Sequence, residues 1–332
     1  MKIIIAGGTG YLGRVLQKYF KKDELVVFTR KPSRPHHIYW DGKTTAGNWQ
    51  QYLNGADVLI NLAGQSVDCR YNKANKQLIY DSRIDATAIL GQAMQLCADP
   101  PGIWINASSA TIYKHSWQQP MDETDGETGN DFSMDVCHAW EKEFFSHSLQ
   151  STRRVAIRTA IVIGRKSPAF NKLKWLTLLG MGAKSASGQQ MVSWLHEEDF
   201  ARAVDFIIKS HLSGVVNLTA PYPISNAGFM KNLRVSLHMP FGIPQPEWLL
   251  KAGAKILNTE TELILKSRYV IPKKLEQAGF QFNYRRVSAA FREILRGKNK
   301  VTPEGWEARS NKQDSIKVHN YAYADKLDKI QE

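Results

Sequence analysis

Apolar residues along the chain gather either in short unbroken runs or in longer stretches with helical spacing. A strand covered on both faces is apolar throughout, whereas an amphipathic helix repeats its apolar residues every three or four positions. Residues 2–6 are of the first kind and residues 11–22 are of the second. On these grounds the sequence predicts strands at 2–6, 25–28, 56–64, 104–109, 153–164 and 215–221, and helices at 11–22, 74–97, 134–149, 197–211 and 226–239.

This alternation of strands and helices predicts an α/β fold with a doubly wound parallel sheet of Rossmann type. After Gly164 the pattern loosens into a stretch rich in Gly, Ser and Lys, which favours a smaller C-terminal lobe. We expect Asn226 to cap the helix at 226–239. The predicted division assigns 1–164 together with 195–220 to the Rossmann domain, 165–194 and 221–297 to the smaller lobe, and 298–332 to a C-terminal extension.

Composition narrows the setting and the partners. The three cysteines form no CxxC pair, so we expect no disulfides and a reducing, cytoplasmic location. No stretch approaches the roughly 20 apolar residues of a membrane span, and we expect no membrane partner. The net charge is +13, and residues 251–300 hold twelve Lys or Arg against four Glu. That charge fits a solvated face or an anion-binding module, and no nucleic-acid motif accompanies it.

A glycine-rich turn links the first strand to the first helix. Residues 7–13 read GGTGYLG, directly after the strand at 2–6. Glycines allow the tight turn, the close approach of a pyrophosphate and close helix packing, while the helix N-terminus attracts phosphate. The sequence therefore predicts a dinucleotide site. Its expected contacts at this turn are Gly7, Thr9, Gly10, Tyr11, Leu12 and Gly13.

The end of the second strand indicates which dinucleotide is bound. Sites that prefer NAD carry an acidic residue there, which binds the ribose 2′-hydroxyl. Here Thr29 is followed by Arg30 and Lys31, so no carboxylate is present. A cation beside the adenosine ribose favours a 2′-phosphate. We therefore expect Thr29 and Arg30 to contact NADP(H), with NAD(H) the less favoured cofactor.

Several motifs in combination identify a family resemblance. Besides the glycine turn they are NLAG at 61–64, ASSATIY at 107–113, RTAIVIG at 158–164, DSR at 81–83, CHAWE at 137–141, GQQMVSWLH at 188–196 and NLTAP at 217–221. Together they resemble the extended short-chain dehydrogenase/reductase superfamily. The closer similarity is to its atypical branch of "epimerase family" proteins, sometimes labelled as SulA-type cell-division inhibitors. The resemblance spans about residues 1–295.

The resemblance implies a dinucleotide along the carboxyl edge of the sheet and a substrate between the two lobes. By position it places Ala63 and Gly64 near the adenosine ribose. It places Ser108 and Ser109 beside the nicotinamide, with Ser109 at the catalytic serine position. Leu62 and Arg83 complete the cofactor contacts that we expect from it.

The catalytic positions of the family are altered in this chain. The usual chemistry needs a tyrosine and, four residues later, a lysine that depresses the tyrosine pKa. Cys137 and Glu141 stand at these positions, and Arg83 replaces a supporting asparagine. Cys137 could act only with a lowered pKa, and Glu141 could act with a raised one or could pair with Arg83. The catalytic candidates are therefore Ser109, Tyr113, Cys137 and Glu141.

Two functions stay open from the sequence. The first is an NADP(H)-dependent oxidoreductase or epimerase acting on a small polar or nucleotide-linked substrate. The second is a non-catalytic NADPH-binding regulator, which the family label would link to cell division. We interpret Trp140 as a core residue and His196 as a structural histidine, and we predict no metal site, since the histidines lack partners at metal-ligand spacing. A monomer and a homodimer are both compatible with the sequence.

Overall fold

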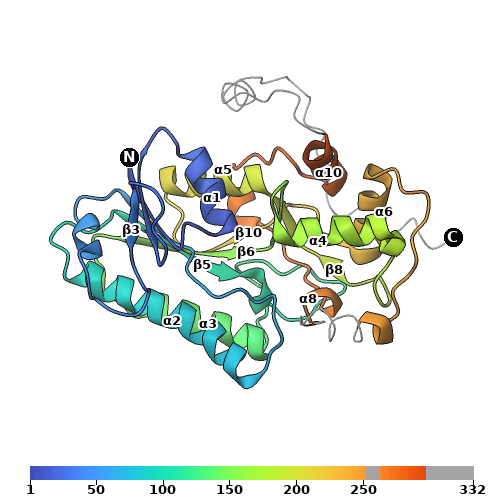
Figure 1. Cartoon of the computed structure of the whole chain (residues 1–332), viewed down its shortest axis with the longest axis horizontal. Helices are drawn as coiled ribbons and strands as arrows, with labels where there is room; N and C mark the ends of the chain where they lie inside the picture. The colour runs from blue at the N-terminus through green and yellow to red at the C-terminus, as the bar shows by residue number, and fades with distance from the viewer. Residues whose placement is uncertain (251–259, 261, 297–332) are drawn as a thin grey trace. The chain divides into compact units, whose positions relative to one another are not determined.

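A seven-stranded sheet lies at the centre of the structure, a computed structural model that describes residues 1–250, 260 and 262–296 (Figure 1). Its strand order is β10-β6-β5-β4-β1-β2-β3, and neighbouring strands all pair in parallel. The predicted Rossmann-type α/β fold is confirmed. The strands are β1 (Lys2–Ala6), β2 (Glu24–Thr29), β3 (His37–Tyr39), β4 (Val58–Asn61), β5 (Ile103–Ser109), β6 (Arg153–Thr159) and β10 (Gly214–Leu218).

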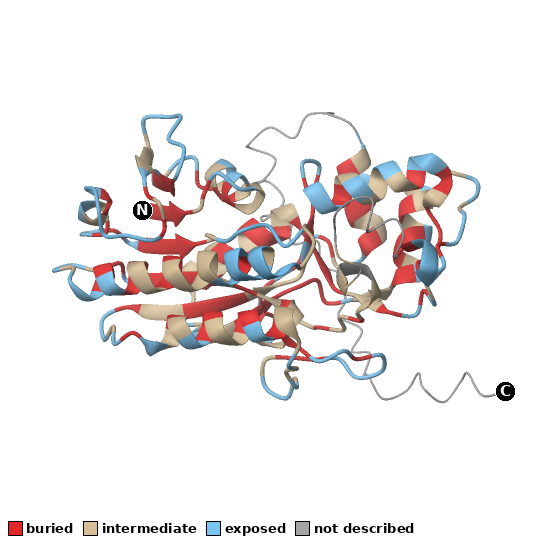
Figure 2. Cartoon of the chain, turned by 60° about the horizontal axis from the view of Figure 1, so that its bottom comes forward, coloured by how far each residue is buried: buried red, intermediate tan, exposed pale blue. Residues whose placement is uncertain are grey.

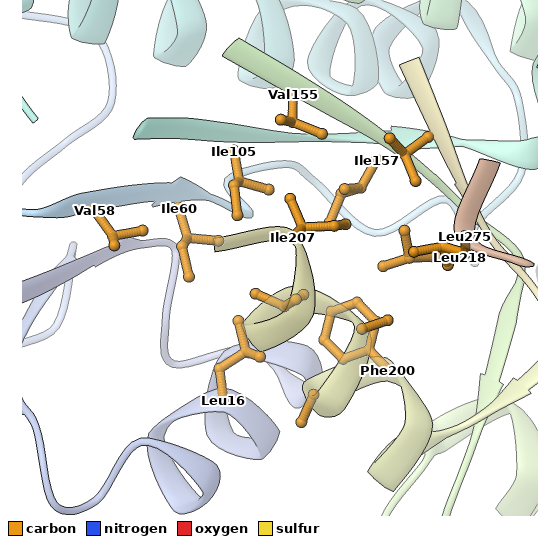
Figure 3. Close-up of a cluster of buried hydrophobic side chains, with 14 of the residues drawn as sticks. Leu16, Val58, Ile60, Ile105, Val155, Ile157, Phe200, Ile207, Leu218 and Leu275 are labelled. Carbon is orange, nitrogen blue, oxygen red and sulfur yellow. The ribbon is translucent and has the colours of Figure 1, made fainter. Parts of the chain in front are cut away.

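Helices cover both faces of this sheet. Side chains of β1 alternate between the two sides: Ile3 and Ile5 pack with α1 (Tyr11–Tyr19) and α5 (Glu197–Lys209), while Ile4 packs with α2 (Lys73–Gln95) and α3 (Phe132–Ser146). Figure 3 shows the first of these clusters, with Leu16 of α1 and Phe200 of α5 below the aliphatic residues of the sheet. Burial on both faces explains why the strands read as unbroken apolar runs.

A further hydrophobic cluster joins elements that follow β6. They are β7 (Ile161–Ile163), α4 (Pro168–Leu176), β9 (Trp194–His196), α6 (Asn226–Ser236) and α10 (Val287–Leu295). Figure 2 shows the buried side of these helices turned inward and their outer side exposed. Shorter elements complete the described part: η1 (Trp49–Tyr52), η2 (Ala110–Ile112), η3 (Thr177–Met181), β8 (Met191–Val192), β11 (Ile224–Ser225), α8 (Glu262–Leu265) and α9 (Lys273–Gln277).

The two predicted lobes do not separate into compact units of their own. Residues Met1–Leu295 form one compact unit. The boundary between the Rossmann domain and the smaller lobe therefore stays a prediction, and the extension at 298–332 lies outside the described residues.

Two local predictions were wrong, and one strand was not predicted. The stretch 153–164 is not one strand, because β6 pairs with β5 and β10 whereas β7 pairs with β9 in a separate sheet. The cap of α6 is Ser225, whose hydroxyl accepts a hydrogen bond from the Gly228 amide at 3.2 Å. Asn226 instead accepts one from the Ser185 amide at 2.8 Å, which ties α6 to the preceding loop. The edge strand β3 was not predicted, because three residues are too short for a readable pattern.

Candidate functional site

The glycine corner, residues 7–13, is held in place by steric contacts that only glycine permits at two positions. Gly7 has φ +72°, and a Cβ there would stand 2.8 Å from the Ala63 backbone. At Gly13 a Cβ would lie 2.2 Å from the Gly8 carbonyl oxygen. Both distances are far below van der Waals contact. The turn and the close packing of α1 onto it therefore require these two glycines.

Gly10 differs, because nothing in the described protein crowds it. Its φ is −68°, and the nearest atom to a Cβ there would be the Gly7 carbonyl oxygen at 3.6 Å. No side chain caps α1, and its first turn holds no acidic residue. The amides at the start of this helix thus lack side-chain acceptors among the described residues, next to the open space at Gly10. A phosphate group fits both the space and the donors.

The adenosine side of the predicted site lies at the end of β2. The hydroxyl oxygens of Thr29 and Thr9 are 3.3 Å apart, which links the strand end to the glycine corner. Arg30 and Lys31 are exposed, and within the described ranges no hydrogen bond or ion pair engages either side chain. A separate hollow of about 480 Å³ lies beside α1. It is lined by Arg14, Gln17, Lys18, Lys21, Asp23, Leu25, Arg34 and His36, and by none of the predicted cofactor residues.

The end of β4 brings three more predicted residues to the same corner. The Leu62 amide donates to the Ala6 carbonyl at 2.9 Å, and the Ala63 amide donates to the Asn61 side-chain oxygen at 3.0 Å. Tyr11 reaches across to donate to a Glu197 carboxylate oxygen at 2.7 Å. Gly64 lies against Arg83, since a Cβ there would be 3.2 Å from the guanidinium carbon. These predicted cofactor residues thus lie near the carboxyl ends of β1, β2 and β4, and Ser108 lies near the end of β5.

A buried ion pair occupies the altered catalytic position on α3. Ser108 and Arg158 are register partners on β5 and β6, so both side chains project toward α3. There Arg158 donates to both Glu141 carboxylate oxygens, at 2.8 and 2.7 Å, and the Ser108 hydroxyl donates to one of them at 2.6 Å. Burial alone would lower the pKa of Arg158, but the Glu141 carboxylate raises it. Glu141 therefore pairs with Arg158, and Arg83 donates instead to the Ile79 carbonyl.

Tyr113 is enclosed rather than presented to a ligand. It is 0% exposed, and its hydroxyl donates to the Asn217 side-chain oxygen at 3.0 Å. The Arg158 guanidinium carbon lies 4.9 Å from the centre of its ring. Burial raises the pKa of Tyr113. Ser109 is only half-buried, and its hydroxyl oxygen accepts from the Thr111 amide at 3.2 Å, which leaves its proton for another acceptor.

Cys137 is a buried thiol between cations. Burial raises its pKa to about 12, the Glu141 carboxylate adds to this, and Arg83, Arg158 and Arg268 act in the opposite direction. The thiol consequently stays protonated near neutral pH. The lowered pKa that nucleophilic or acid–base use of a thiolate requires is not produced here.

Several residues at the site escaped the sequence analysis. Arg158 and Asn217 lie inside motifs that carried the family resemblance, yet neither residue stood out, because their partners are distant in the chain. Asn61 donates to the Asn106 side-chain oxygen at 2.7 Å and to Thr87 at 3.2 Å. Trp140 also donates to Thr87, at 2.9 Å, and is buried as predicted. A buried asparagine at the end of a strand was the available signal for this network.

Other predicted features concern the surroundings of the site. His196 is 2% exposed, caps α5 and lies 3.1 Å from a Glu293 carboxylate oxygen, in keeping with a structural role. Cys69, Cys97 and Cys137 are free thiols. Among the described residues, no cluster of His, Cys, Asp and Glu has the composition of a metal site. In the same part of the chain, no helix has both the length and the apolar composition needed to cross a membrane.

The chain matches known protein families. A profile described as "NAD dependent epimerase/dehydratase family" matches residues 3–219, and one described as a domain of unknown function matches 245–294. The chain is 30% identical to the epimerase family protein YfhF of Bacillus subtilis, over 91% of this chain and 100% of that protein.

Two solved structures extend the comparison to three dimensions. Human epimerase family protein SDR39U1 (isoform 2), solved with NADPH, superposes with a TM-score of 0.81 at 28% identity, over 90% of this chain and 100% of that one. A nucleoside-diphosphate sugar epimerase from Corynebacterium glutamicum gives a TM-score of 0.73 at 27% identity, over 89% of this chain and 58% of that one. The chain therefore belongs to the NAD-dependent epimerase/dehydratase family, within the extended short-chain dehydrogenase/reductase fold.

Proposed function

We propose that the chain binds NADP(H) on the glycine corner and the ends of β2, β4 and β5. The observation that carries the proposal is the open space over Gly10, where neither backbone conformation nor packing requires a glycine. Uncapped amides at the start of α1 supply donors for the pyrophosphate. Arg30 and Lys31 supply charge for a 2′-phosphate. The human relative solved with NADPH supports the same cofactor.

We further propose NADP(H)-dependent oxidoreduction or epimerisation of a small polar substrate. When bound, the nicotinamide supplies or accepts a hydride at the substrate carbon. Ser109 has a hydroxyl proton to donate, and it would orient and polarise the substrate carbonyl. Glu141 acts as a positioning residue, since it holds Ser108 and Arg158. Among the other candidates, Tyr113 and Cys137 would serve through their place beside Arg158 rather than as free proton carriers.

A non-catalytic NADPH-binding regulator is the alternative that the altered catalytic positions raised. The relatives are named for the epimerase family and give a regulatory role no support. Cytoplasmic location and a monomeric or homodimeric state stay predictions of the sequence.

Calorimetric titration with NADPH and NADH tests the cofactor assignment. We expect NADPH to bind more tightly, and Arg30→Ala to weaken NADPH roughly 10-fold or more while changing NADH little, since a charged hydrogen bond contributes about 1.5–3 kcal/mol. Arg292→Ala, an exposed arginine on α10, is the matched control. Equal affinities in wild type and Arg30→Ala would remove the 2′-phosphate assignment.

The catalytic assignment needs a separate assay. NADPH oxidation is followed with a panel of carbonyl compounds and nucleotide sugars, in wild type and in Ser109→Ala. Turnover that falls at least about 100-fold in Ser109→Ala supports the role of this serine. Tight NADPH binding without turnover across the panel would favour the regulator.

A further inference from the structure

Unlike Arg158, two guanidinium groups near Cys137 have no carboxylate hydrogen-bonded to them among the described residues. Within the described ranges, Arg83 donates to a neutral carbonyl, that of Ile79, at 2.8 Å. Arg268 has a carboxylate oxygen of Glu262 at 4.0 Å, but that oxygen lies closer to Lys266, at 2.9 Å. The Nη1 atom of Arg268 is buried and finds no acceptor among the described residues. A buried N–H donor without an acceptor costs free energy unless a bound ligand supplies one.

The position of Arg83 is fixed by two flat contacts. Its guanidinium carbon lies 5.2 Å from the centre of the Trp140 ring, one turn along α3 from Cys137. It also lies close to Gly64, where a Cβ would be 3.2 Å from the guanidinium carbon, tighter than an ordinary contact. Since Gly64 lies just beyond the end of β4 at Asn61, Arg83 stands at the carboxyl edge of the sheet, where ligands of this fold class bind.

Arg268 reaches the same place from the far end of the chain. Val270 packs in one apolar cluster with Cys137 and Tyr113. The Ser193 hydroxyl donates to the Arg268 carbonyl at 2.7 Å and accepts from the Val270 amide at 2.9 Å, which anchors the segment. Both Arg83 and Arg268 interact electrostatically with the Cys137 thiol. The two guanidinium groups therefore both lie close enough to Cys137 to act on its thiol, and they come from different elements.

The two altered residues on α3 suit an anion at this place. The protonated Cys137 thiol carries no charge, so it does not repel an anion. The negative charge of Glu141 is matched by Arg158 through two hydrogen bonds, so it does not leave an uncompensated charge to repel an incoming anion. Among the described carboxylates, Glu262 and Asp131 act on Arg268, and both already contact Lys266.

We propose that the substrate carries a carboxylate or phosphate group that Arg83 and Arg268 bind over Cys137. The proposal rests on the proposed function, because it places this anion beside the nicotinamide. It narrows the substrate class from any small polar molecule to an anionic one. The guanidinium pair then orients the substrate by holding this anion.

The test titrates two probes, inorganic phosphate and oxalate, into protein saturated with NADPH, with chloride at equal ionic strength as the reference. Saturation removes the cofactor's own phosphate sites from the measurement. We expect one probe to raise the thermal midpoint, and the stronger probe identifies phosphate or carboxylate chemistry. Arg268→Gln and Arg83→Gln should each weaken the affinity for that probe roughly 10- to 100-fold, the range for charge-assisted hydrogen bonds. Arg292→Gln should bind it as the wild type does.

NADPH affinity measured on the same samples separates the two proposals. If NADPH does not bind the wild type, the proposed function fails. If NADPH binds and neither probe exceeds chloride, or if both glutamine variants bind the probe as the wild type does, the anion site is wrong. If Arg268→Gln fails to fold, the same probe titration is done with Arg268→Lys, which keeps the charge, and with Arg83→Gln.

Discussion

The glycine corner and the face of α3 that carries Cys137 and Glu141 lie at two parts of one sheet edge, yet they are built differently. The shape of the corner depends on backbone conformation and on the absence of side chains, because backbone atoms lie too close to Gly7 and Gly13 for a Cβ. The site on α3 depends on paired side chains, because Arg158 and Ser108 hold Glu141 in place through hydrogen bonds. A site built from backbone atoms can be recognised from its glycine pattern in the sequence. A site built from side-chain pairs cannot be recognised in this way, because other pairs of residues can fill the same positions.

Substitutions at two glycines of the corner sharpen the comparison most. Gly13→Val should lower the free energy of unfolding by about 4 kcal/mol or more, because its Cβ would collide with the Gly8 backbone at 2.2 Å. Gly10→Ala should leave the unfolding free energy within about 1 kcal/mol, since its φ of −68° suits alanine. Yet Gly10→Ala should weaken NADPH binding by at least roughly 10-fold. Urea unfolding and calorimetry measure both.

The contrast between the two variants is the control. If Gly10→Ala keeps full NADPH affinity, the space over Gly10 does not receive the pyrophosphate. If Gly13→Val is as stable as the wild type, the corner relaxes more easily than its contacts indicate.

Breaking the ion pair on α3 tests the other half of the comparison. Glu141→Ala should cost about 3 kcal/mol of unfolding free energy, because it leaves Arg158 charged, buried and unpaired. The double variant Glu141→Met with Arg158→Met should recover most of this loss, since no charge remains uncompensated. Urea unfolding of the set measures it. Equal losses in the single and double variants would show that packing, not the charge pair, holds this face.

The same contrast explains what the sequence could predict. Apolar runs specify strands buried on both faces, so the parallel sheet and its helices follow from the pattern around Ile3 to Ile5. The glycine corner follows as well, since its steric demands are local. The partner of Glu141 does not, because Arg158 is brought to it by the register of β5 and β6 rather than by any spacing along α3. Arg268 is farther still, and its place depends on Ser193 anchoring the segment.

The smallest effect that we predict concerns the Cys137 thiol. Its pKa is about 12 in the folded chain against 9.0 ordinarily, so above pH 9 the unfolded chain loses a proton that the folded chain keeps. The stability that this raised pKa supplies is complete below pH 9 and is lost as the pH rises toward 12. The stability of the wild type relative to Cys137→Ala should therefore fall by about 1.4 kcal/mol between about pH 8 and about pH 10.

Alkylation gives the independent measurement. Iodoacetamide should modify Cys137 in the urea-unfolded chain and leave it unmodified in the folded chain near neutral pH, as followed by peptide mass spectrometry. A folded-state Cys137 that reacts rapidly at neutral pH would mean that Arg83, Arg158 and Arg268 outweigh burial and stabilise a thiolate. That result would return Cys137 to the catalytic role that burial now argues against, and it would make the two ends of the sheet edge more alike than their structures indicate.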